Sequence, residues 1–197
     1  MRFDISLYQI NYKLLPLIIM KKLFRLKALA FFAFAFLVSS VASAQMGKQQ
    51  ASPRDSVSGT IGGSTIKINY GSPSVKGRQV WGGLVPYGKL WRTGANPATT
   101  FETSKDVKIE GQTLPAGKYS VFTLPGETEW KVIFNSQTGQ WGIKRDGSAN
   151  DDPAKDVLTV TVKSMKSESF NEALKFAITP KGFVLLWENL AVPVKVQ

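Results

Sequence analysis

The 197-residue sequence contains no cysteine and no histidine. The absence of cysteine excludes disulfide bonds, thiol catalysis and zinc–thiolate centres. The absence of histidine removes the commonest general base and metal ligand, and with it any Ser-His-Asp triad. These missing residues favour a binding protein over an enzyme, and we expect the chain to carry neither a metal nor another cofactor.

Long apolar runs are missing except near the N-terminus. An uncharged apolar run spans residues 28–38, after four Lys and Arg residues between positions 21 and 27, and an Ala-x-Ala sequence ends at Ala44. A basic segment, a short apolar run and small residues in this order are typical of a secretory signal peptide. The run is shorter than the roughly 20 apolar residues that cross a bilayer. We therefore expect cleavage after Ala44, a periplasmic or secreted protein, and no membrane span in the mature chain.

Residues 1–19 add little to this signal. A complete signal peptide could begin at Met20, because two lysines follow it directly and the apolar run begins at residue 28. We interpret residues 1–19 as a mis-assigned start, the alternative being a long N-terminal region that is translated. In either case we expect residues 1–44 to form the signal peptide and not to belong to the folded domain.

Basic residues outnumber acidic ones, but the excess is smaller in the mature chain. Six of the 25 Lys and Arg residues and one of the 14 Asp and Glu residues lie in residues 1–44, which leaves 19 and 13, a net charge of +6. The remaining Lys residues are spread singly along the chain. A nucleic-acid-binding protein would show a basic patch or stripe. We therefore expect no nucleic-acid partner.

A helical period is absent from residues 45–197, whereas short strand-like runs recur. Residues 45–53 are polar and predict a flexible lead-in, and residues 54–197 predict a single β-rich domain. Gly62-Gly63 predicts a hairpin in which Ile66, Ile68 and Tyr70 face the core. The two strands of this hairpin are expected at 56–61 and 64–70. Further strands are expected at 99–103, 107–109, 119–124, 130–134, 157–163, 174–178, 183–187 and 192–196. The spacing predicts an all-β, mainly antiparallel β-sandwich of jelly-roll or Ig-like type, with a closed β-barrel as the alternative.

One segment lacks the regular alternation of strand-like runs and turns. Residues 71–97 form a loop of 27 residues in which turn formers alternate with aromatic and basic side chains. Loops longer than about 12–15 residues are uncommon unless they are functional or disordered, and this one is too aromatic for disorder. We expect it to be ordered, packed against the sheet, and to carry the functional site.

Several strings in this part of the chain resemble a known family. The loop contains LVPYGKLWRTGAN at 84–96, and further on come LPAGKYSVFTLP at 114–125, EWKVIFN at 129–135 and QWG at 140–142. These strings resemble the exported bacterial proteins catalogued as domain of unknown function 2911. The resemblance covers nearly the whole mature chain and implies family membership without implying an activity.

Five residues of the loop are candidate ligand-binding residues: Arg78, Tyr87, Trp91, Arg92 and Asn96. An aromatic face can stack on a ligand, while Arg and Asn bind its polar groups directionally. The alternative is that the aromatic residues close the core and that Arg92 braces the loop. In that case Arg92 should be at least half buried and bonded to backbone carbonyls or to a carboxylate such as Glu102.

The acidic residues are scattered. Glycoside hydrolysis needs two facing carboxylates, and Glu102 is the best single candidate for a catalytic role because it follows the loop. A solvated position on an exposed strand face is the competing interpretation. Four aspartates between positions 146 and 156 could contribute oxygen ligands for calcium, but their spacing does not match an EF-hand, which favours a solvated turn.

These observations predict an exported cell-envelope protein that acts as a non-catalytic binding or interaction domain through the 71–97 loop. Its partner would be an envelope component, namely a glycan, a peptide or a protein. A carboxylate-dependent glycan hydrolase is the alternative function.

Overall fold

The computed structural model describes residues 51–197. The predicted signal peptide and residues 45–50 of the predicted lead-in lie outside the described residues. Between residues 51 and 197 the structure consists of ten β-strands and one short 3-10 helix, without an α-helix. No helix in this part of the chain is long and apolar enough to cross a membrane.

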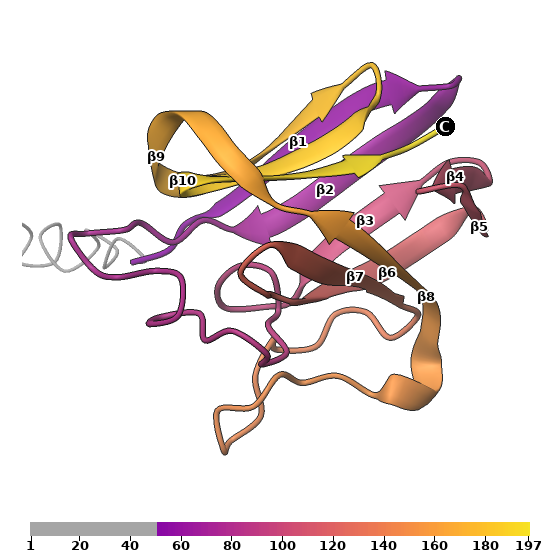
Figure 1. Ribbon diagram of the computed structural model, residues 1–197. Coiled ribbons are helices and arrows are strands. Elements are labelled where there is room, and N and C mark those ends of the chain that lie inside the picture. The colour runs from indigo at the N-terminus through magenta and orange to yellow at the C-terminus, as the bar shows by residue number, and fades with distance from the viewer. Residues whose placement is uncertain (1–50) are drawn as a thin grey trace, which may run out of the picture. The chain divides into compact units, whose positions relative to one another are not determined.

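Six of the strands form one antiparallel sheet (Figure 1). In spatial order they are β1 (Arg54–Ile61), β2 (Ser64–Gly71), β3 (Thr99–Thr103), β6 (Gly117–Leu124), β7 (Glu129–Asn135) and β8 (Asp156–Lys163). Neighbours in the chain are neighbours in the sheet, apart from an excursion between β3 and β6. This excursion is a small hairpin of β4 (Val107–Ile109) and β5 (Gln112–Leu114).

The second layer is a long hairpin of β9 (Met165–Thr179) and β10 (Gly182–Lys195). It lies across one face of the six-stranded sheet (Figure 1). The large sheet ends at β1 and β8 and does not close. The predicted antiparallel β-sandwich is therefore confirmed, with the strand order of a meander, and the closed barrel is not the architecture of this chain.

Alternation of apolar and polar residues sets the register of the first hairpin. Ile66, Ile68 and Tyr70 are buried, whereas Lys67 is exposed. Gly62 and Gly63 have φ values of 56° and 75°. Both lie in the left-handed region that a two-residue hairpin turn requires, which explains why glycine occupies both positions.

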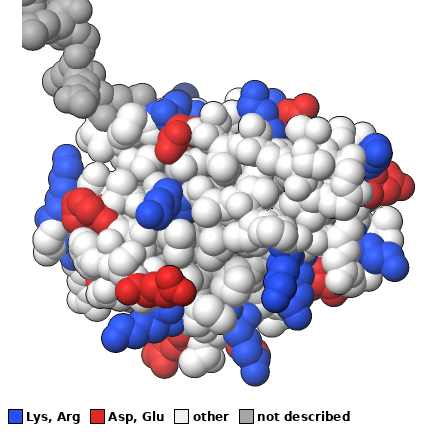
Figure 2. Space-filling view, turned by 90° about the horizontal axis from the view of Figure 1, so that it is seen from above, with Lys and Arg blue, Asp and Glu red and all other residues white. Residues whose placement is uncertain are grey.

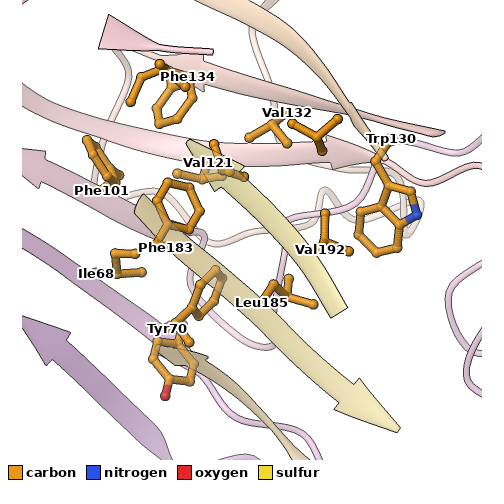
Figure 3. Packing of buried hydrophobic residues seen from close by; sticks show 14 of the residues in the cluster. Ile68, Tyr70, Phe101, Val121, Trp130, Val132, Phe134, Phe183, Leu185 and Val192 are labelled. Carbon is orange, nitrogen blue, oxygen red and sulfur yellow. The ribbon is translucent and has the colours of Figure 1, made fainter. Parts of the chain in front are cut away.

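The core lies between the two layers. Phe183, Leu185 and Val192 of β10 face Val121 and Val132 of the large sheet (Figure 3). Each of these side chains is almost fully buried. Burial of one such side chain contributes about 1.5–3 kcal/mol, so this interface is the main source of stability for the sandwich.

The last hairpin is more continuous than its sequence suggests. The expected strands at 183–187 and 192–196 largely fall within the single strand β10, which has register shifts on both sides of Glu188. Glu188 itself has a φ of 54°. An irregularity of this kind bends a strand without ending it, and its polar residues give the false signal of a loop.

Charged residues are dispersed over the surface. On the face shown in Figure 2, single Lys and Arg residues are separated by uncharged atoms and by acidic residues. No continuous basic stripe crosses this face of the described domain.

Candidate functional site

Two long loops meet beside the large sheet. The loop between β2 and β3 (72–98) and the loop between β7 and the 3-10 helix (136–152) come together below the sheet in Figure 1. The amide of Gly142 donates to the carbonyl of Asn96 over 3.0 Å, and the amide of Ala98 donates to the carbonyl of Gln140 over 3.2 Å. The two loops are thus joined by backbone hydrogen bonds and form one ordered surface.

The first loop is packed against the core, as its aromatic content predicts. Val75, Val80 and Val85 are buried in the central cluster. Trp91 exchanges two backbone hydrogen bonds of 2.8 Å with Thr123 of β6. The loop is therefore fixed both by apolar burial and by a backbone bridge to the sheet.

Four tryptophans surround this bridge. Trp81 packs edge-to-face against Trp91, Trp130 and Trp187, with ring centroids 6.0, 5.1 and 5.5 Å apart. Trp91 stacks on Trp187 at 6.0 Å with an interplanar angle of 19°. Such pairs add roughly 0.5–1.5 kcal/mol beyond the burial of their area. The cluster supports the segment that carries Arg92.

The indole N–H groups of this cluster have unequal environments. Trp91 Nε1 donates to the carbonyl of Gly94 over 3.1 Å. The Nε1 atoms of Trp81, Trp130 and Trp187 are buried without a conventional acceptor. Edge-to-face packing offers aromatic faces as weaker acceptors in their place.

A cleft of about 510 Å³ opens between the two loops. The first loop provides Leu84, Val85, Pro86, Lys89, Leu90, Trp91 and Arg92, and the second, with the first residue of the 3-10 helix, provides Ile143, Lys144, Gly147, Ser148, Ala149, Asp151 and Pro153. A smaller cleft of about 180 Å³ shares Trp91 and Arg92 with it and also reaches Arg78 and Trp187. The volume of the larger cleft is in the range of small-molecule sites.

Arg92 is the most unusual residue of this cleft. It is more than half buried, and burial lowers the pKa of its guanidinium. Its Nε atom is fully buried and has no hydrogen-bond partner. Among residues 51–197 the sole salt bridge joins Lys155 to Asp152, so no carboxylate neutralises Arg92.

The predicted burial of Arg92 is confirmed, but its predicted bonds to backbone carbonyls or to Glu102 are wrong. Glu102 is exposed on β3. There it lies in register between Lys67 of β2 and Lys118 of β6. Glu102 alternates with the buried Phe101 and Thr103, so its carboxylate is directed away from the core, and it lines neither cleft.

The backbone next to Arg92 is strained. Thr93 is buried with a φ of 57°, which is costly for a β-branched residue. The Thr93 carbonyl accepts a hydrogen bond of 2.8 Å from the Thr99 hydroxyl, which helps to hold this conformation. On the other side, a Cβ added to Gly142 would collide with Cδ of Arg92. Both features fix the direction of the Arg92 side chain.

The opposite wall is organised by Asn135. This residue is fully buried at the end of β7. Its Nδ2 lies 3.0 Å from Asp151 Oδ1, 2.7 Å from Asp156 Oδ1 and 2.8 Å from the Asp152 carbonyl. Of the two carboxylates that it contacts, only Asp151 lines the cleft.

The pKa of the Asp151 carboxyl is raised, chiefly by burial and then by the neighbouring charges of Asp156 and Asp152. The native state therefore binds this proton more tightly than the unfolded state. Stability consequently falls as the pH rises through the native pKa. Ionised Asp151 is thus a source of instability at neutral pH.

We expect Asp151→Asn to be more stable than the wild type at pH 7, because an amide oxygen can still accept from Asn135. The difference should shrink as the pH falls through the native pKa of Asp151 and disappear below about pH 3, where the wild-type carboxyl is protonated in both states. Urea unfolding across this pH range measures it. Asp146→Asn is the matched control, since bonds from Ser148 lower the pKa of Asp146 and its replacement should not stabilise the protein at pH 7. Equal effects of the two substitutions would contradict the assignment.

The structure brings three of the five predicted loop residues together. Trp91 and Arg92 line both clefts, and Arg78 lines the smaller one. Arg78 donates from Nη2 to the carbonyl of Ser74 over 2.6 Å and from Nε to that of Val75 over 3.1 Å. Arg78 therefore braces the loop from within.

The other two predicted residues lie outside the clefts. Asn96 donates from Nδ2 to the carbonyl of Ser52 over 3.0 Å and so fixes the entry of the chain into β1. Tyr87 is 40% exposed and lines neither cleft. Burial and the charges of Glu127 and Glu188 raise the pKa of its hydroxyl.

Sequence reasoning missed the second loop as part of the site. Ile143, Lys144 and Asp151 line the cleft, yet the polar composition around them predicts a solvated turn. The signal that could have identified this loop is Gly142, because a glycine beside aromatic and apolar residues indicates a close backbone approach. Within residues 51–197, no group of three or more acidic residues is arranged to hold a metal ion.

Fold and cleft together define a β-sandwich domain with a ligand-sized site built from two joined loops. Residues 52–196 match the family described as a protein of unknown function, DUF2911, and the chain belongs to this family. The resemblance expected from the loop strings is confirmed. No curated protein and no solved structure matches the chain.

Proposed function

We propose that this protein is an exported, non-catalytic binding domain of the cell envelope, and that its ligand presents an anionic group to Arg92 in the larger cleft. The observation that carries the proposal is the buried guanidinium nitrogen without an acceptor. Buried polar groups are nearly always hydrogen-bonded, and a buried charge costs several kcal/mol unless a partner of opposite charge compensates it. An anion in the cleft that Arg92 lines would bind the guanidinium group and compensate its charge.

The surroundings of Arg92 support an anionic ligand. Lys89 and Lys144 line the same cleft, against a single carboxylate from Asp151. A cleft dominated by one sign of charge attracts ligands of the opposite sign. The strained backbone at Thr93 is a second indication, since such strain persists where the side chain has a task.

The cleft provides less support for the alternative hydrolase. Retaining and inverting glycoside hydrolysis both require two carboxylates facing one substrate bond. Asp156 shares the amide of Asn135 with Asp151 but does not line the cleft. Glu102 is exposed on β3 and does not line the cleft.

Arg92→Met tests the binding site. We expect this variant to lose roughly 10- to 100-fold in affinity for organic anions, because a charge-assisted hydrogen bond contributes about 1.5–3 kcal/mol. We also expect its stability to be unchanged or increased by up to about 1 kcal/mol, because an unpaired buried charge is removed while the packing volume remains. Titration with octanoate and phenyl phosphate, followed by tryptophan fluorescence, and urea unfolding measure the two effects.

The matched control is Arg145→Met, which removes an identical charge from the second loop. Arg145 is exposed and lines neither cleft. The Arg145→Met variant should bind both anions with the affinity of the wild type. If Arg92→Met bound them with unchanged affinity, or if it were destabilised by several kcal/mol, the anion-binding role of Arg92 would be refuted.

Export is the other part of the proposal, supported by the basic, apolar and Ala-x-Ala pattern that ends at Ala44. Intact-mass measurement of protein made in a bacterial host that secretes it should give a chain that begins at Gln45. Replacing Ala42 and Ala44 by bulky residues should cause the precursor to accumulate. A mature mass that still includes residues 20–44 would contradict cleavage at this position.

A further inference from the structure

The larger cleft has apolar walls as well as basic residues. Leu84, Pro86 and Leu90 line it from the first loop, Ile143 from the second, and Pro153 from the start of the 3-10 helix. Leu84 is 45% exposed, which is unusual for a large apolar side chain beside a cleft of this size. An inorganic anion would leave these surfaces in water, whereas a ligand with an apolar body would cover them.

The aromatic side chains of the site do not form a sugar-binding platform. Trp91 is stacked on Trp187 and lies edge-to-face with Trp81. Trp141 is the most exposed tryptophan, at 52%, and it does not line the cleft. Stacking of a pyranose ring needs an open aromatic face, so the cleft favours an aliphatic or small aromatic body over a glycan.

The carboxylate of Asp151 restricts where in the cleft a ligand can carry negative charge. Lys89, Arg92 and Lys144 attract an anion, but Asp151 lies in the same wall, and its pKa is already raised by burial and by the charges of Asp156 and Asp152. A second negative charge on the ligand would add to this repulsion. The fork of a guanidinium fits a carboxylate or a phosphodiester equally well.

From this geometry we infer that the ligand is an amphipathic monoanion, an apolar body with one carboxylate or phosphodiester group, whose acidic end binds Arg92 and whose body lies against Leu84, Leu90 and Ile143. This inference rests on the proposed anion site and adds the chemical class of its ligand. The apolar body supplies affinity through burial, and the single charge supplies orientation.

A homologous series of carboxylates tests this inference on the exported chain. The probes are acetate, butyrate and octanoate, with octanamide as the neutral analogue and octylmalonate as the dianion. Methyl octyl phosphate distinguishes a phosphodiester end from a carboxylate end. Affinities are measured by isothermal titration calorimetry at pH 7.5, where octylmalonate carries two charges.

We expect affinity to rise roughly 2- to 4-fold for each methylene between butyrate and octanoate, as burial of a CH₂ group predicts. Octanamide and octylmalonate should each bind at least about 10-fold more weakly than octanoate, because one lacks the charge for Arg92 and the other opposes Asp151. A tighter affinity for methyl octyl phosphate than for octanoate would assign the phosphodiester as the preferred end group.

Ile143→Ala provides a variant that alters the apolar wall alone. It should reduce octanoate binding several-fold and leave acetate binding unchanged. Ile133→Ala is the matched control, since Ile133 is a partly buried residue of β7 that lines neither loop cleft. It should leave both affinities unchanged.

The outcomes separate this inference from the proposed function. Equal affinities for acetate and octanoate would overturn the apolar body while leaving the anion site intact. An equal or tighter affinity for octylmalonate would overturn the limit of one charge. Octanamide binding as tightly as octanoate, or no binding of any anion, would overturn the proposed function together with the inference.

Discussion

Trp130→Ala should lower the free energy of unfolding by about 3–5 kcal/mol, the usual cost of truncating a large aromatic core residue. Trp130 is 1% exposed on β7 and contacts Trp81 with ring centroids 5.1 Å apart. Its removal creates a cavity beside Trp81 and Trp91, whose ring centroids lie 5.1 and 6.3 Å from that of Trp130. A loss of this size approaches the whole stability of a small domain.

Equilibrium urea unfolding measures this loss, with Trp141→Ala as the control. Trp141 is 52% exposed and lies outside the tryptophan cluster. Its truncation should cost less than about 1 kcal/mol, as surface substitutions usually do. Similar losses for the two variants would show that the cluster does not stabilise the domain.

Asn135→Leu should also lower the free energy of unfolding by about 3–5 kcal/mol, because the carboxylates of Asp151 and Asp156 then lose a buried hydrogen-bond donor. Leucine keeps the branched outline of asparagine but has neither its amide donor nor its carbonyl acceptor, so the main change is the loss of hydrogen bonds. Asn135 Oδ1 also accepts from the amide of Gln137 over 2.8 Å, and this bond is lost as well. We expect the second loop to detach from β7 and the cleft to lose its Asp151 wall.

The pH dependence of Asn135→Leu provides its control. Protonation of Asp151 in acid removes its uncompensated charge, so the deficit should shrink between pH 7 and pH 3. Ser136→Ala, at the adjacent exposed position, should cost less than about 0.5 kcal/mol at either pH. A deficit that does not vary with pH would assign it to packing instead of to the carboxylates.

The strands could be predicted because their signal is local. Alternation at Ile66, Ile68 and Tyr70, with Gly62-Gly63 between the runs, defines a hairpin without knowledge of the rest of the chain. That the 71–97 loop is ordered was predictable for a similar reason, since burial of its tryptophan side chains is favourable whatever the rest of the fold. β10 was divided incorrectly because a bend at Glu188 resembles a loop in sequence.

The site was only partly predictable because its two walls are distant in sequence. Trp91 and Arg92 were identified from the first loop, but the lack of a partner for Arg92 depends on which groups the fold brings near it. Alternation on β3 places Glu102 on the exposed face, which the sequence alone could have indicated. The contact between Asn135 and Asp151 joins residues that belong to separate polar segments, and no periodicity predicts it.

These findings assign a physical cost and a physical role to the same residue. Arg92 is retained in a buried position where its charge has no partner within the described domain. In the proposed function, this cost is offset when a ligand anion binds. A binding protein with such a site should gain stability on adding its ligand, and the ligand should be recognised by charge before shape.

The most direct test of this account observes the Arg92 Nε–H group itself. Selective ¹⁵N labelling of arginine resolves the Nε–H signals, and octanoate is added stepwise to the wild-type protein. We predict that the Arg92 signal, assigned by its absence in Arg92→Met, shifts and saturates together with the tryptophan fluorescence, because a carboxylate bound to the guanidinium group polarises its Nε–H bond. The Arg145 signal should remain unchanged. An Arg92 signal that does not move while octanoate binds would contradict the central claim that this guanidinium is the anchor of an anion-binding site.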